Sequence, residues 1–93
     1  MKIGLTVTGL DGETRHVVAG FKDQIGYEKY TGKTLTSWKE TIPGLYDFAV
    51  LAWITETGQE MPFTAWTDTV EMVMFDGVET VDPTRPGVSP GQP

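Results

Sequence analysis

Alternating apolar and polar residues at the start of the chain predict a β-hairpin. Ile3, Leu5 and Val7 alternate with small or polar residues, which is typical of a half-buried strand. Asp11-Gly12 is a strong turn signal, and residues 13–19 then follow as the returning strand. Because a lone hairpin is only marginally stable in water, we expect it to pack on a helix or pair with another strand.

Helical periodicity follows the hairpin. Residues 20–31 predict a short helix, with Gly32 as its C-cap. Gly26 inside this helix has two interpretations: it permits a close helix crossing, or it marks a weak helix at a cost of about 1 kcal/mol relative to alanine. Leu35 and Trp38, in the connection that follows, are expected to fold back onto the core.

The most apolar stretch, residues 45–74, predicts two helices joined at residues 57–60. In the first, apolar residues recur at the spacing of a core-facing stripe and also extend beyond one face. Such a broad apolar surface is hard to cover within a small domain, so we expect part of this helix to meet another subunit. The second helix starts near Phe63 and ends at Asp76-Gly77, with one apolar stripe formed by Phe63, Trp66, Val70, Val73 and Met74.

Together these elements indicate one small α+β domain over residues 1–80, with an N-terminal β-hairpin followed by about three α-helices. Residues 81–93 have no periodicity and contain four prolines, which predicts a flexible Pro-rich tail or linker. The sequence shows neither an N-terminal signal nor the ~20 apolar residues that a membrane helix needs. We therefore expect a soluble protein that does not insert into a membrane.

The net charge of −6 is unevenly distributed along the chain. Residues 1–39 carry six basic and four acidic side chains, whereas residues 40–82 carry nine acidic side chains and no basic one. The predicted helical pair is therefore anionic, which argues against binding nucleic acid, whose phosphates require Lys and Arg. It permits a basic protein partner or the more basic N-terminal half of a neighbouring copy, while the alternative is a solvated face that maintains solubility.

The residues that commonly carry chemistry do not form a recognisable site. His16 is the only histidine and has no nucleophile or metal partner at suitable spacing, so it reads as a surface strand residue. Asp68 and Glu71 lie three apart in the predicted second helix of the pair and read as a solvated face. The chain lacks cysteine, and residues 6–12 lack the lysine and following helix of a phosphate loop. We expect no catalytic, metal or cofactor-binding residues, no small-molecule ligand and no enzymatic activity.

The order of these patterns resembles the short tail assembly chaperones of long-tailed (siphovirus-type) phages, particularly those that infect actinobacteria. The resemblance covers about residues 3–75 and rests on loose hydrophobic patterns. After the hairpin, it is carried by Asp23-Gln24-Ile25-Gly26-Tyr27-Glu28, Leu51-Ala52-Trp53-Ile54 and Phe63-Thr64-Ala65-Trp66-Thr67-Asp68-Thr69-Val70-Glu71. The resemblance implies a protein that coats the tape measure protein in the bacterial host cytoplasm during tail assembly and is absent from the mature virion.

The predicted contact surface lies on the anionic helical pair. The candidate partner-binding residues are Leu51, Trp53, Ile54, Trp66, Asp68 and Glu71. The tryptophans read as core residues, and any exposed ring would be a contact anchor. Two other functions stay open: a structural virion component, such as a head–tail connector or tail accessory protein, and an acidic regulator that inhibits a basic host factor.

Overall fold

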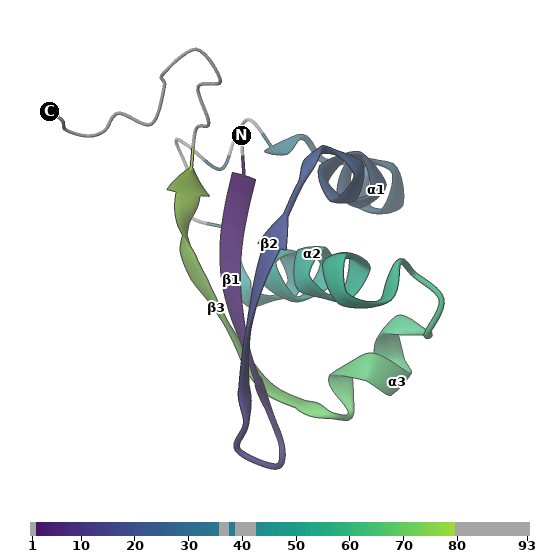
Figure 1. Cartoon of the computed structure of the whole chain (residues 1–93). Helices are drawn as coiled ribbons and strands as arrows, with labels where there is room; N and C mark the ends of the chain where they lie inside the picture. Colours follow the sequence, from purple (N-terminus) through teal and green to yellow (C-terminus); the bar gives the residue numbers. More distant parts are fainter. Residues whose placement is uncertain (1, 36–37, 39–42, 80–93) are drawn as a thin grey trace, which may run out of the picture.

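A three-stranded antiparallel sheet forms one layer of the fold, and α1 and α2 lie on one side of it (Figure 1). The computed structural model describes residues 2–35, 38 and 43–79. The elements are β1 (Lys2–Gly9), β2 (Thr14–Ala19), α1 (Phe21–Thr31), α2 (Leu45–Thr57), α3 (Phe63–Thr67) and β3 (Val70–Glu79). The expected α+β fold is therefore confirmed.

The central strand of the sheet is β1, and the strand order is β2-β1-β3. Ile3, Leu5 and Val7 are fully buried, as their alternation predicts, and they point towards the helices. The hairpin between β1 and β2 turns at Gly12, whose φ of 87° lies in the left-handed region that favours glycine. The other edge of β1 pairs with β3, so the hairpin gains the third strand that its stability requires.

Helix α2 is the central element of the core, and most of it is buried within one chain. It contacts all three strands, while α1 and the ring of Trp38 contact it from other directions. Its buried residues are Phe48, Val50, Leu51, Ala52, Trp53 and Ile54. Most of the helix that was expected to meet another subunit is therefore covered by its own chain, whereas Leu45 and Tyr46 at its start are exposed. Contact with another subunit stays a prediction.

Gly26 permits the close crossing of α1 and α2. A Cβ atom at this position would lie only 3.2 Å from the Cγ2 atom of Ile54. Of the two interpretations left open by the sequence, the structure therefore supports the close crossing. Leu35 and Trp38 are buried, as predicted, and the Trp38 ring makes an edge-on contact with Phe48 at a centroid distance of 5.6 Å.

The prediction that the second helix of the pair is long was wrong. Helix α3 has only five residues, and strand β3 begins at Val70. From Val70 onwards the chain fills the free edge of β1, with Val73 facing the core and Met74 exposed on the opposite face. The pairing with β1 explains why the strand forms, since alternate residues gain ladder hydrogen bonds and alternate side chains gain cross-strand neighbours on the core face.

Two further predictions concern the Pro-rich tail and the absence of a membrane helix. The Pro-rich tail predicted at residues 81–93 lies outside the described residues. Among the residues that the structure does describe, no helix has the length and apolar character needed to cross a membrane.

We predict that Trp53→Ala lowers the free energy of unfolding by about 3–5 kcal/mol, because it leaves a large cavity in the core. The Trp53 side chain is buried, and its Nε1 donates a hydrogen bond to the carbonyl oxygen of Met61 at 2.6 Å. Urea unfolding measures the change. The control is Phe21→Ala, since Phe21 is 78% exposed and its loss should change stability by at most about 0.5 kcal/mol. Equal effects of the two substitutions would contradict the core assignment of Trp53.

Candidate binding surfaces

One face of the sheet is left uncovered by the described helices. It carries the side chains that alternate with the buried ones along the three strands. Among them, Val18, Met72 and Met74 are exposed apolar side chains, and Met74 is 57% exposed. An apolar group on an open sheet face is a common feature of protein contact surfaces.

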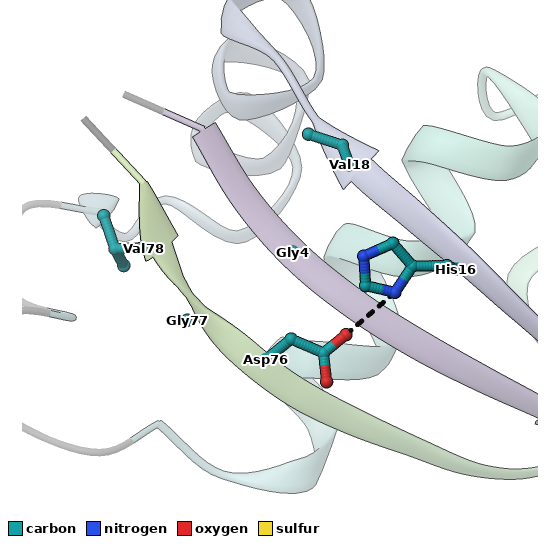
Figure 2. Close-up of a pocket in the computed structure, with 6 residues that line it drawn as sticks. All are labelled: Gly4, His16, Val18, Asp76, Gly77 and Val78. Atoms are coloured by element: carbon teal, nitrogen blue, oxygen red, sulfur yellow. Dashed lines mark ion pairs between the residues drawn. The ribbon is translucent and has the colours of Figure 1, made fainter. Parts of the chain in front are cut away.

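A polar cluster spans this open face across β1. Figure 2 shows His16 of β2 and Asp76 of β3 facing each other over the central strand. The Nδ1 atom of His16 lies 3.1 Å from Oδ2 of Asp76, and Thr6 Oγ1 donates a hydrogen bond to the same carboxylate oxygen at 2.6 Å. Gly4 leaves a hollow of about 220 Å³ beside the pair, since it has no side chain to fill the space.

The contacts of this cluster cross the sheet. Thr6 on β1 donates to Asp76 of β3, and the same carboxylate lies against His16 of β2. Within residues 2–35, 38 and 43–79, no three His, Cys, Asp or Glu side chains converge in a way that could hold a metal ion. The ion pair therefore connects the two outer strands of the sheet.

A second hollow, the β3-edge groove, lies between the start of α2, α3 and β3. Its volume is about 210 Å³, and six of its eight lining residues are apolar. They are Leu45, Ala49, Trp66, Val70, Met72 and Val73, and the remaining two are Thr67 and Glu71. Leu45 is 65% exposed at the N-terminal end of α2, so the groove offers apolar surface to a partner.

A hydrogen-bonded network fixes Trp66, which lines this groove. The Trp66 Nε1 donates to Oε1 of Glu56 at 2.9 Å. Arg15 binds the same carboxylate with two hydrogen bonds, of 2.6 Å from Nε and 3.0 Å from Nη2. Because Arg15, Glu56 and Trp66 belong to β2, α2 and α3, the network sets the position of α3 relative to the sheet. The hydrogen bonds from Arg15 lower the pKa of Glu56 below 4.5, an effect that outweighs burial.

A similar network holds the other end of α2. The Tyr27 hydroxyl donates to Oδ1 of Asp47 at 2.7 Å, and Lys33 Nζ lies 3.2 Å from the same oxygen. Burial raises the pKa of Tyr27 to about 12, and the bond to Asp47 acts in the same direction. Burial also tends to raise the pKa of Asp47, but Tyr27 and Lys33 outweigh it and lower that pKa below 3.8.

The structure separates the candidate partner-binding residues into two groups. Leu51, Trp53 and Ile54 are buried, and their assignment to a contact surface is corrected: they are core residues. Trp66 is also buried, but it forms part of the lining of the β3-edge groove. Asp68 and Glu71 are exposed. They do not share a helix face, because Asp68 follows α3 and Glu71 belongs to β3. Their role in binding stays a prediction.

Sequence reasoning missed the groove because it took β3 for a helix. The sequence placed Leu45 in the core-facing stripe of its helix and Met72 on the opposite side of the next one, whereas both are exposed and line the groove. The alternation of exposed Met72 and Met74 with buried Val73 has the period of a strand, but it is visible only in the structure, because all three residues are apolar.

The acidic residues of the second half of the chain also fall into two groups. Asp47, Glu56 and Asp76 pair with Lys33, Arg15 and His16, all of which lie earlier in the chain. Glu60, Asp68 and Glu71, which flank α3 in the sequence, are exposed and form no ion pair within the part of the chain that the structure describes. Within the second half of the described chain, the exposed carboxylates without an ion pair therefore lie around α3 and the start of β3.

No protein-family model matches the chain, and no curated protein or solved structure matches it either. The function must therefore be inferred from the chain's own residues and surfaces.

We predict that Glu56→Gln lowers the free energy of unfolding by about 1–2 kcal/mol at pH 7, because charge-assisted bonds from a partly exposed Arg15 are lost. The folded-state pKa of Glu56 is lowered, so this stabilisation is present above about pH 4.5 and is lost as the pH falls through the lower folded value. Urea unfolding of both proteins should therefore converge in acid.

The control for this substitution is Glu60→Gln, which removes an exposed carboxylate that has no ion-pair partner among the described residues. Its stability should differ from that of the wild type by at most about 0.5 kcal/mol at either pH. A constant stability difference between Glu56→Gln and the wild type across the acid range would contradict the assigned role of the Glu56 charge.

Proposed function

We propose that this protein is a non-enzymatic tail assembly chaperone of a long-tailed phage, which binds the tape measure protein and keeps it soluble during tail assembly. The observation that carries the proposal is the uncompensated acidic region around α3 and β3, which adjoins exposed apolar side chains. The family resemblance of residues 3–75 supports the same role. The proposed site of action is the bacterial cytoplasm, before the tail tube polymerises.

The chemistry of this surface suits an elongated helical client. Such a client exposes apolar side chains until the tube encloses it, and it would aggregate if they stayed in contact with water. A small protein that offers apolar contacts within an acidic surround can cover these side chains when basic residues flank them. Many copies bound along one client would add their affinities through multivalency.

We predict that co-expression with the tape measure protein of the same phage moves that client into the soluble fraction, where the two proteins co-purify. Covering the exposed apolar side chains of the client is the physical reason. The measurement is the soluble fraction of the client, with an unrelated acidic protein of similar size as the control. A client that stays insoluble with nothing co-purifying would refute the proposed function.

The same proposal predicts that mature virions contain no stoichiometric amount of this protein, because a chaperone leaves when the tube closes. Mass spectrometry of purified particles measures its copy number against the major tail proteins. Stoichiometric copies in the virion would instead favour a structural component, such as a head–tail connector or tail accessory protein.

We also predict that the protein self-associates. The sequence-based reason for this expectation was α2, which is buried, but the open sheet face presents Val18, Met72 and Met74 as another apolar contact. Light scattering at high concentration should give a mass above the 10.2 kDa of one chain. The double substitution Val18→Lys and Met74→Lys should lower that mass. A monomeric mass for the wild type at every concentration would contradict the prediction.

A further inference from the structure

We infer that the β3-edge groove receives an apolar side chain from a helical segment of the partner in which Lys or Arg residues flank that side chain. The inference rests on the proposed function only in naming the tape measure protein as the source of that segment. The groove itself defines the chemistry of its occupant through its size, its lining and its charge.

The size of the groove matches one large apolar side chain. Its volume of about 210 Å³ exceeds the ~150 Å³ of an apolar cavity that holds a benzene molecule. Leu, Met or Phe therefore fits between Leu45 on α2 and Val70 on β3. The hydrogen bond from Trp66 to Glu56 holds the α3 wall in place, so less ordering is needed when a partner binds.

The charge around the groove selects basic flanking residues. Glu71 lines the groove, and Asp68 is exposed just beyond α3. Residues 43–79 contain no Lys or Arg, so this part of the chain supplies no cation to either carboxylate. A second copy that presented the same region would bring like charges together, whereas a segment with Lys or Arg beside its apolar residue would complement them.

The shape of β3 favours a helix over an added strand as the occupant. The register between β1 and β3 shifts at two places, where Glu71 and Asp76 are the extra residues on β3. Regular pairing is therefore divided into two runs, Met72–Phe75 and Gly77–Glu79, each of which is short for strand addition. A helix that places one apolar side chain in the groove needs no continuous strand edge.

Binding of two synthetic peptides tests the inference. One is an amphipathic helix of about five turns with a Leu stripe and Lys on its other positions, and the second has the same stripe with Glu in place of Lys. Isothermal titration calorimetry with the full chain should show binding of the Leu/Lys peptide and at least about tenfold weaker binding of the Leu/Glu peptide. Equal binding of the two peptides would overturn the assigned charge preference.

Matched substitutions locate the binding site on the chain. Leu45→Ser should weaken binding of the Leu/Lys peptide about five- to tenfold, as expected for an apolar contact. Leu10→Ser is the control, because Leu10 is also 65% exposed but is not among the residues that line the groove. Glu71→Gln should weaken binding about threefold at low salt and less at high salt, while Glu13→Gln should not. Equal losses for each substitution and its control would overturn the inference.

Nuclear magnetic resonance separates the two modes of binding. Helical signals from the bound Leu/Lys peptide, with shifts at Leu45 and Val70, would support the inference. New cross-strand contacts between the peptide backbone and β3 would overturn it in favour of strand addition.

The co-expression assay distinguishes failure of this inference from failure of the proposed function. Loss of client solubility with Leu45→Ser but not with Leu10→Ser would support both. Equal solubility with both variants would overturn the groove as the client site and leave the chaperone function intact. A client that stays insoluble even with the wild type, while the Leu/Lys peptide still depends on Leu45, would overturn the function and leave the groove inference intact.

Discussion

The burial of α2 is the constraint on which the rest of the fold depends. This helix is apolar on nearly every side, and a domain of this size has few elements with which to cover it. The sheet covers one side, and α1 approaches another closely because Gly26 has no side chain. Without β3 as a third strand, the stacked contact between Phe48 and Phe75 would be missing and part of α2 would face water.

Sealing α2 moves the binding surface to the periphery. All three tryptophans are buried in the core, so a partner meets smaller apolar patches at the sheet face and at the β3-edge groove. The groove exists because α3 ends after five residues and the chain then turns into β3 beside the start of α2. The hydrogen bonds among Arg15, Glu56 and Trp66 fix that turn. The same bonds therefore stabilise the fold and hold the groove in shape.

Local sequence patterns predicted the β-hairpin and α2. They missed β3, because this strand is determined by its pairing with β1. Strict alternation and Asp11-Gly12 specified the hairpin, and the apolar run before Gly58 specified α2. Residues 70–74 fit a helical stripe with Phe63 and Trp66 as well as a strand, and only the free edge of β1 decides between them. The pairing of His16 with Asp76 joins residues 60 apart in the chain, so no local spacing could reveal it.

The division of the acidic residues indicates why the charge around α3 has a role beyond solubility. Where a carboxylate of the second half of the chain stabilises the fold, a basic residue from the first half lies against it, as Arg15 does with Glu56. Asp68 and Glu71 have no such partner within the described residues, although Glu71 lines a preformed apolar groove. A charge spread only for solubility would have no reason to concentrate beside apolar surface, whereas a site for a basic, apolar segment requires both features together.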